Sequence, residues 1–262
     1  MRVFLGITGA SGAPYAARLV ESLAAAECDV GLCASAAGIQ VLATELYGDP
    51  RLPRDEVLAR FTERAQDAVT VFDPHDYSAP YASGSASVDG YVVCPCSMAT
   101  AGTIATGGEA NLIHRAAGVA LKEERKLVLV PRETPLSTIH LENLLTLRRA
   151  GATILFAAPG FYHGAETVND LVDFVAGRAL AQLGLEQNLV KPWGALRHQA
   201  CDRLVVAGNH DLFTLGYAIQ LFAEPGLGLG CSHACHSVSL RFEQASTSFA
   251  WPSKHARSPL DH

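Results

Sequence analysis

Six short apolar runs, most of them followed by a stretch of helical periodicity, constrain the fold of this chain more than any other feature. They predict strands at residues 3–7, 30–34, 69–72, 91–94, 127–130 and 153–156, with helices near 14–26, 36–46, 56–65, 111–122 and 167–183. The runs are apolar at consecutive positions, which is typical of strands buried on both faces. They predict an α/β fold: a three-layer, doubly wound sandwich with a mainly parallel sheet, flavodoxin/Rossmann-like.

Composition excludes several classes of protein. Hydrophobic residues make up 49% of the 262 residues, which is too many for a disordered chain. Twenty Lys and Arg against 26 Asp and Glu give no support for a nucleic-acid binder. There is no apolar run of about 18 residues that predicts a membrane span, and the N-terminus has no signal peptide. We therefore expect a cytoplasmic protein whose seven cysteines are reduced.

The turns that follow the predicted strands hold the unusual chemistry of the chain, because ligands of open α/β sheets bind at this edge. Residues 6–12 have glycines at three-residue spacing just before a helix, where backbone N–H groups suit an anion such as phosphate. A tight turn without a ligand explains the same pattern. The turn lacks the dinucleotide fingerprint, and the second strand ends in Ser35 instead of the acidic residue of an NAD site.

Three further strand ends carry polar groups. Ser97 is a helix N-cap candidate, and the neighbouring Cys94 and Cys96 lack the spacing of a redox or zinc motif, so we interpret both as structural. Glu133 follows an arginine between two prolines, and a carboxylate in that position suits proton transfer near a bound phosphate. Tyr162 adds a phenol hydroxyl after the last predicted strand.

Basic residues on two predicted helices are candidates for anion binding. Arg115 and Lys122 are seven residues apart and share a helix face. Arg178 lies beside the apolar stripe of its helix, where a guanidinium needs an anionic partner. The spacing leaves two partners open, an internal carboxylate or the phosphate of a ligand.

Nine motifs in order give the chain a resemblance that covers about residues 2–193. They are T-G-A-S-G-A at 8–13, A-T-E at 43–45, A-S-G-S at 82–85, C-P-C-S at 94–97, N-L-I-x-R at 111–115, A-L-K-E at 120–123, L-V-L-V-P-R-E-T-P at 127–135, I-H-L-E-N at 139–143 and P-G-F-Y-H at 159–163. By this set the chain is identified as a member of the UbiX/Pad family of flavin prenyltransferases. These are flavodoxin-like flavoproteins related to the FMN-dependent cysteine decarboxylases.

The resemblance implies an enzyme that joins the dimethylallyl group of dimethylallyl monophosphate to N5 and C6 of reduced FMN without a metal. FMN is then a substrate, and the product, prenylated FMN, serves a UbiD-type decarboxylase. A large homo-oligomer, a dodecamer, with the flavin at subunit junctions is also implied. Two alternatives on the same fold are an FMN-dependent cysteine decarboxylase and a non-catalytic FMN carrier. The former carries a P-x-M-N segment where this chain has residues 131–134.

The resemblance also implies roles for individual residues, with no metal ligand among them. The FMN-binding positions are Gly9, Ala10, Ser11, Ser35, Ser97, Met98, Ala99, Thr100 and Arg132. The prenyl-phosphate positions are Arg115, Lys122, Tyr162 and Arg178. The catalytic positions are Ser11, Glu45, Glu133 and Lys122. Residues 83–85 and Trp193 match segments that neighbouring subunits contribute to line or cover the site.

Two features depart from the family pattern. Tyr77 stands where the family commonly has a tryptophan, which changes the wall of the prenyl pocket. The second is an extension at residues 195–262, beyond a flavoprotein domain at 1–194. In it, Cys231, His233, Cys235 and His236 have no standard zinc spacing, and we interpret them as an adventitious or weak metal site at most.

Overall fold

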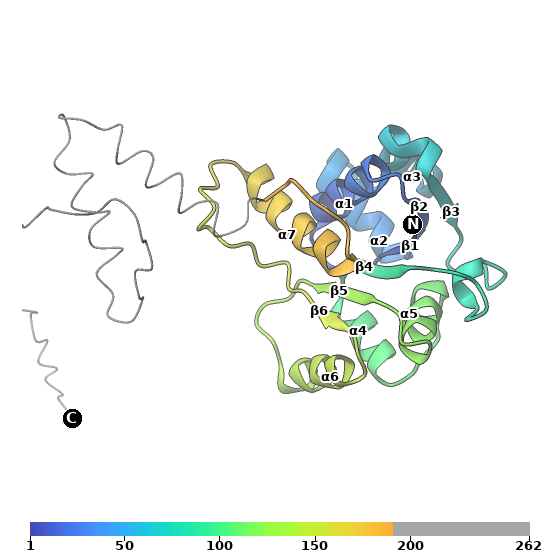
Figure 1. Cartoon of the computed structure of the whole chain (residues 1–262). Coiled ribbons are helices and arrows are strands. Elements are labelled where there is room, and N and C mark those ends of the chain that lie inside the picture. Colours follow the sequence, from blue (N-terminus) through green and yellow to red (C-terminus); the bar gives the residue numbers. More distant parts are fainter. Residues whose placement is uncertain (191–262) are drawn as a thin grey trace, which may run out of the picture. The chain divides into compact units, whose positions relative to one another are not determined.

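The computed structural model describes residues 1–190, which form a three-layer α/β sandwich around a six-stranded sheet (Figure 1). Its strands are β1 (Arg2–Ile7), β2 (Asp29–Ala34), β3 (Val69–Phe72), β4 (Gly90–Cys96), β5 (Leu127–Pro131) and β6 (Thr153–Ile154). The spatial order is β3-β2-β1-β4-β5-β6, and every neighbouring pair is parallel. The predicted fold class is confirmed.

Seven helices connect and cover these strands. They are α1 (Ala13–Ala25), α2 (Ala36–Tyr47), α3 (Arg54–Thr62), α4 (Met98–Ala105), α5 (Leu112–Lys122), α6 (Thr138–Arg149) and α7 (Val168–Leu183), with 3₁₀ turns η1 (Glu63–Ala68) and η2 (Pro80–Ala82). Five helices begin at a residue whose side chain accepts a hydrogen bond from the first turn: Ser35, Ser97, Asn111, Ser137 and Thr167. Such caps satisfy N–H groups that have no partner within the helix.

The sixth strand is shorter than predicted. The expected strand at 153–156 is reduced to β6, although the N–H groups of Leu155 and Ala157 still donate to the β5 carbonyls of Leu129 and Pro131. As an edge strand, β6 pairs on one side only, so its regular ladder ends early although the chain continues along β5.

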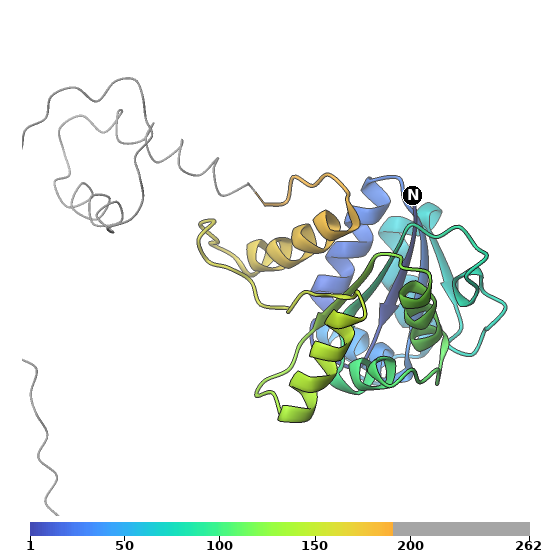
Figure 2. The same ribbon diagram turned by 60° about the horizontal axis from the view of Figure 1, so that its bottom comes forward.

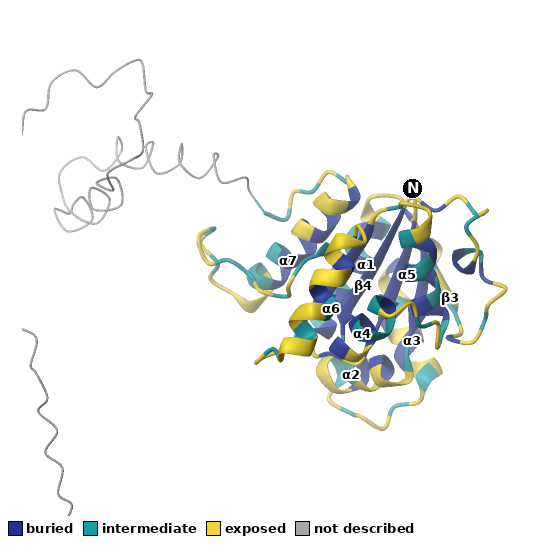
Figure 3. Cartoon of the chain, turned by 90° about the horizontal axis from the view of Figure 1, so that it is seen from below, coloured by how far each residue is buried: buried dark blue, intermediate teal, exposed yellow. Residues whose placement is uncertain are grey.

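The continuous apolar runs are explained by two cores, one on each face of the sheet. Val3, Leu5 and Ile7 of β1 pack with α1, α2, α3 and α7, whereas Phe4 lies in the opposite core with α4, α5 and α6. Figure 2 shows these helices on both sides of the sheet, and Figure 3 shows buried strands beneath an outer face of α6 that is exposed. Both faces of each strand are therefore apolar.

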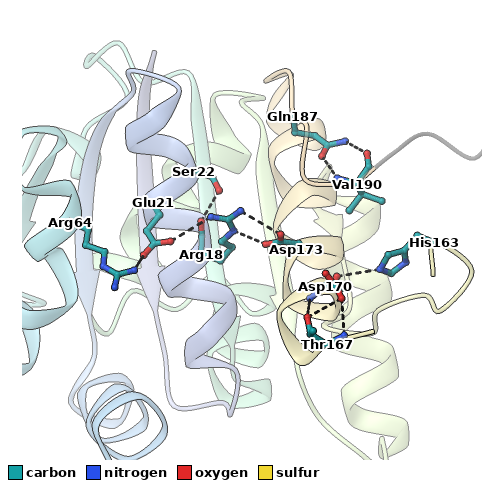
Figure 4. Close-up of polar contacts among 10 residues, drawn as sticks. All are labelled: Arg18, Glu21, Ser22, Arg64, His163, Thr167, Asp170, Asp173, Gln187 and Val190. Atoms are coloured by element: carbon teal, nitrogen blue, oxygen red, sulfur yellow. Dashed lines mark hydrogen bonds and ion pairs between the residues drawn. The ribbon is translucent and has the colours of Figure 1, made fainter. Parts of the chain in front are cut away.

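An ion-pair network fastens α7 to α1 (Figure 4). The Nε of Arg18 lies 2.5 Å from a carboxylate oxygen of Asp173, and Glu21 bridges Arg18 to Arg64. The Arg18 and Asp173 side chains are one quarter to one third exposed, so this pair contributes at most about 1 kcal/mol. Its main consequence is that the carboxylate of Asp173 on α7 is already paired with Arg18.

Several predictions fall outside the described residues. These are the domain boundary at 194/195, Trp193, and the cluster of Cys231, His233, Cys235 and His236. Within residues 1–190, no helix is long and apolar enough to cross a membrane. In the same range, no group of three His, Cys, Asp or Glu side chains is arranged to hold a metal ion.

Candidate functional site

The strand order reverses between β1 and β4, and this switch point determines where a ligand of an open parallel sheet binds. Thr8, which follows β1, connects the two strand ends. Its buried hydroxyl donates to the carbonyl of Pro95 and accepts from the N–H of Ser97, both at 2.8 Å. The turn after β1 and the loop after β4 are thereby held in one fixed arrangement.

The start of α1 already has an anion from the protein itself. A carboxylate oxygen of Glu45 accepts hydrogen bonds from the N–H groups of Gly12 (2.9 Å) and Ala13 (2.8 Å). At the end of the anion cradle expected at residues 6–12, Glu45 from α2 therefore takes the place expected for a phosphate. This bond places the predicted catalytic Glu45 next to Ser11. Gly9 permits the approach, since a Cβ there would lie 2.6 Å from the Cβ of Ala37.

The starts of α2 and α4 fit a phosphate better. Ser35 caps α2, with its hydroxyl accepting from the N–H of Gly38 at 3.0 Å. Ser97 caps α4 and shares hydrogen bonds with both the N–H and the hydroxyl of Thr100. The first N–H groups of α4, on Met98 and Ala99, have no acceptor within the helix. Hydroxyls and free N–H groups at a helix N-terminus are the donors that a flavin phosphate requires.

Arg132, which follows β5, contacts the turn after β1. Its Nε donates to the carbonyl of Ser11 at 3.3 Å. Glu133 follows it with an exposed side chain that accepts from the N–H of Thr134 at 3.1 Å. We call the residues that meet here the switch-point cluster: Gly9, Ala10, Ser11, Ser35, Glu45, Ser97, Met98, Ala99, Thr100, Arg132 and Glu133.

Arg115 and Lys122 lie on a separate surface. α5 begins near the end of β3, where the N–H of Leu112 donates to Pro74, and it ends near the start of β4, where Tyr91 bonds to Lys126. The helix spans about 16 Å, so its last residue, Lys122, lies toward the opposite edge of the sheet. We call Arg115, Gly118 and Lys122 the α5 face. Within residues 1–190, no hydrogen bond or ion pair joins the α5 face to the switch-point cluster.

The remaining candidates gather on α7. The ring of Tyr162 packs edge-on against Phe174 at 5.7 Å, and Phe174 stacks on His163 at 5.2 Å. His163 is anchored by a bond of its Nε2 to the Asp170 carbonyl (Figure 4). Arg178, one turn beyond Phe174, is exposed, and the described residues give it no ion pair. Asp173, a carboxylate on the same helix, pairs with Arg18 instead of Arg178, so phosphate binding by Arg178 stays a prediction.

Cys94 and Cys96 are buried free thiols. Burial raises the pKa of both, that of Cys96 to about 12, so neither supplies a thiolate at neutral pH. The structural interpretation fits this environment. The residue that the sequence analysis missed is Thr8, although a hydroxyl at the end of a buried strand always needs hydrogen-bond partners.

Comparisons with known proteins show the family of this chain. The family model described as Flavoprotein matches residues 1–180. The flavin prenyltransferase UbiX of Pseudomonas aeruginosa is 48% identical over 198 residues, covering 74% of this chain and 94% of that protein. The chain belongs to the UbiX family of flavin prenyltransferases. This confirms the resemblance drawn from the nine motifs.

Solved structures of UbiX-family proteins are similar as well. One is described as a dodecameric FMN-dependent Ubix-like decarboxylase from Escherichia coli O157:H7; it is 41% identical, with a TM-score of 0.65 over 74% of this chain and 99% of that one. Another is AnUbiX (PadA1) in complex with FMN and dimethylallyl pyrophosphate, at 38% identity, a TM-score of 0.65, and coverage of 73% and 96%.

Proposed function

We propose that this UbiX-family chain transfers the dimethylallyl group of dimethylallyl monophosphate to N5 and C6 of reduced FMN. The observation that carries the proposal is the switch-point cluster. Its residues come from the ends of β1, β2, β4 and β5, at the edge where the sheet order reverses. Thr8 joins the ends of β1 and β4, and Arg132 at the end of β5 donates to Ser11.

FMN fits this cluster through its phosphate and its ring. Ser35, Ser97, Thr100 and the N–H groups that open α4 hold the phosphate. Ser11 and Arg132, joined by a hydrogen bond from the Nε of Arg132 to the Ser11 carbonyl, would hold the flavin ring. When bound, reduced FMN supplies the nucleophilic atoms and an electron-rich surface for the allylic group. Glu45, fixed on the N–H groups of Gly12 and Ala13, stays next to Ser11 and removes a proton at the flavin.

The prenyl donor needs fixed positive charge, because its C–O bond breaks as phosphate leaves. Arg115, Lys122 and Arg178 supply that charge, and Tyr162 donates a hydrogen bond to the same phosphate. Glu133 carries a proton to the departing phosphate. The prenyl carbon that loses phosphate would replace the proton on N5. The prenyl double bond would then take up a proton, and its far carbon would replace the proton on C6. The two protons removed from the flavin balance the two added, one to the phosphate and one to the double bond.

The α5 face reaches the flavin from a neighbouring subunit. Arg115, Lys122 and residues 83–85 belong to one surface, since Arg115 donates to the carbonyl of Ala82 and Arg125 donates to that of Gly84. This surface lies away from the switch-point cluster of its own chain. A homo-oligomer, which we expect to be a dodecamer as described for the Escherichia coli relative, supplies the missing contact.

The test is an anoxic incubation of the purified chain with reduced FMN and dimethylallyl monophosphate, followed by mass analysis of the bound flavin. We expect a flavin heavier by one five-carbon prenyl unit. Unmodified FMN would indicate a carrier, and release of carbon dioxide from a peptidyl or pantothenoyl cysteine would indicate a decarboxylase. Either result would refute the proposal.

The cellular setting completes the proposal. The product, prenylated FMN, passes to a UbiD-type decarboxylase. The reaction takes place in the cytoplasm, where thiols such as the four buried free cysteines of the described part persist. Residues 1–194 carry the activity, and residues 195–262 are an extension to that domain.

A further inference from the structure

Tyr162, the phenol assigned to the prenyl phosphate, lies outside every helix and strand. It belongs to residues 159–167, which connect β6 to α7 and which we call the Tyr162 loop. The side chain is exposed, and that of its neighbour Phe161 is more exposed still. A hydrogen bond weakens steeply away from its ordinary distance and angle. A hydroxyl on such a loop therefore needs contacts that fix its place before it can bind a phosphate.

The ring of Tyr162 is packed between its own loop and α7. Its centroid lies 5.7 Å from that of Phe174 and 6.0 Å from that of His163, edge-on in both cases. A Cβ on Gly160 would lie 2.8 Å from a ring carbon of Tyr162, so a larger residue there would push the ring away. Arg178 follows Phe174 by four residues and shares its face of α7. The ring therefore packs beside the other prenyl-phosphate candidate of this helix.

His163 attaches this loop to the first turn of α7 (Figure 4). Its ring stacks on Phe174, with the centroids 5.2 Å and the planes 20° apart. Its Nε2 lies 3.3 Å from the carbonyl oxygen of Asp170, and Nε2 is the donor because a carbonyl only accepts. The other ring nitrogen, Nδ1, is buried and has no hydrogen-bond partner within residues 1–190. In that range, the bond to Asp170 is therefore the hydrogen bond that orients the ring.

The residue that His163 binds is itself fixed in place. The carboxylate of Asp170 accepts hydrogen bonds from the N–H groups of Glu166 and Thr167, at 2.9 and 2.7 Å, and from the Thr167 hydroxyl at 2.9 Å. These bonds close the end of the Tyr162 loop onto the start of α7. The carbonyl of Asp170 thus belongs to a fixed turn, and His163 connects that turn to the residue next to it, Tyr162.

We infer that His163, through its bond to the Asp170 carbonyl, is a positioning residue that holds the Tyr162 hydroxyl at the prenyl phosphate. The inference rests on the proposed function and adds a residue to it. We assign His163 no contact with either substrate, and it acts through Tyr162 alone. Without the bond to Asp170, the backbone and ring of Tyr162 have a wider range of positions. The phenol then forms its hydrogen bond to the departing phosphate less often.

The experiment is a double-mutant cycle of His163→Ala and Tyr162→Phe, measured as kcat/KM for dimethylallyl monophosphate in the prenylation of reduced FMN. Each single variant should lose about tenfold, because both weaken the same hydrogen bond to a charged phosphate. In the Tyr162→Phe background, His163→Ala should change kcat/KM by less than about twofold, since the hydroxyl that it positions is gone. FMN affinity, measured by quenching of flavin fluorescence, should stay unchanged in all three variants. A general loss of structure would persist in the Tyr162→Phe background.

Two further variants separate the bond from the rest of the side chain. His163→Gln carries an amide nitrogen that donates as Nε2 does, so it should recover most of the kcat/KM that His163→Ala loses. Gln187→Ala is the matched control. Gln187 donates from its side-chain nitrogen to the Val190 carbonyl at 3.1 Å, beyond the other end of α7 (Figure 4). Loss of that bond should leave kcat/KM unchanged.

Each outcome decides one question. A loss in His163→Ala that disappears in the Tyr162→Phe background, with recovery in His163→Gln, supports the inference. Equal losses in the two backgrounds overturn it, as does wild-type kcat/KM in His163→Ala. A Gln variant as impaired as the Ala variant, or an equal loss in Gln187→Ala, also overturns it. All of these results require a wild type that prenylates FMN, and a wild type without that activity would refute the proposed function and the inference together.

Discussion

The switch-point cluster and the α5 face are built in opposite ways. The cluster is assembled by backbone and hydroxyl hydrogen bonds within one chain, with Thr8 and Glu45 joining residues that are up to about ninety positions apart. The α5 face presents charged side chains on one helix, and their partners are other exposed charges. The difference fits our proposal that a single chain shapes the flavin site, whereas a second copy completes the prenyl-phosphate site.

Replacement of Lys122 should produce the largest effect on prenylation while FMN binding by the switch-point cluster is unchanged. We expect Lys122→Ala to lower the rate of FMN prenylation about 100-fold or more, since it removes a fixed charge from the leaving phosphate. FMN affinity, measured by quenching of flavin fluorescence, should stay within twofold of the wild type. Glu133→Gln should likewise retain FMN and lose prenylation. Arg149→Ala, an exposed cation on α6, is the control and should leave both measurements unchanged.

Mixed oligomers test whether the two regions come from different chains. Lys122→Ala and Glu133→Gln, each inactive alone, are co-expressed with different affinity tags, and mixed oligomers are isolated. If a site takes its α5 face from one chain and Glu133 from another, about a quarter of the sites are intact and activity returns to that fraction. The pair Glu133→Gln and Arg132→Ala, both in the switch-point cluster, should recover nothing. Mixed oligomers without recovered activity would contradict a shared site.

Thr8 provides the matching test for the switch-point cluster. Thr8→Val keeps the shape of the side chain but leaves the N–H of Ser97 without its acceptor at a buried position. We expect the free energy of unfolding to fall by about 1–3 kcal/mol, and FMN to bind about tenfold more weakly because the loop before α4 loses its position. Thr8→Ser retains the hydroxyl, so it should keep most of the stability and most of the FMN affinity of the wild type. Denaturant titration and flavin fluorescence provide the measurements, and full FMN affinity in Thr8→Val would contradict the assigned role.

The comparison also explains what the sequence could predict. The parallel sheet was predictable because strands buried on both faces leave uninterrupted apolar runs, as in Leu127–Val130. Strand ends then identified Ser97 and Arg132, because the carboxyl ends of parallel strands share one edge. The length of β6 was not predictable, since an edge strand ends where pairing ends and composition does not mark that point.

Long-range polar contacts could not be predicted in the same way. Glu45 lies 33 positions from Gly12, and nothing in the spacing indicates that its carboxylate caps α1. Glu109 precedes α5 in a loop, and its carbonyl accepts a hydrogen bond from the Tyr77 hydroxyl. Nothing in the sequence spacing indicates that the Glu109 carboxylate pairs with Arg115. The motifs identified the residues that the proposed chemistry requires. Their hydrogen-bond and ion-pair partners, such as Gly12 for Glu45 and Glu109 for Arg115, are set by tertiary packing.

The smallest expected effect is a change in thermal stability, and it differs between α5 and α7. These two helices carry Arg115, Lys122 and Arg178, the cations predicted to bind the prenyl phosphate. Asp170 on α7 accepts hydrogen bonds from the N–H groups of Thr167 (2.7 Å) and Glu166 (2.9 Å) and from the Thr167 hydroxyl, which hold its pKa below the ordinary 3.8. The α5 helix starts instead at the neutral amide of Asn111, which accepts from the N–H of His114. A lowered pKa in the folded state gives stability that is present above about pH 4 and is lost as the pH falls through the folded value.

Asp170→Asn should therefore lower the Tm by a few degrees at pH 7, and the difference from the wild type should shrink as the pH falls below about 3.8. Asn111→Ala should lower the Tm by an amount that does not change over the same range, because no charge is involved. Thermal unfolding of both variants between pH 3 and 7 provides the comparison. A constant difference for Asp170→Asn would show that its carboxylate does not stabilise the start of α7 through its charge.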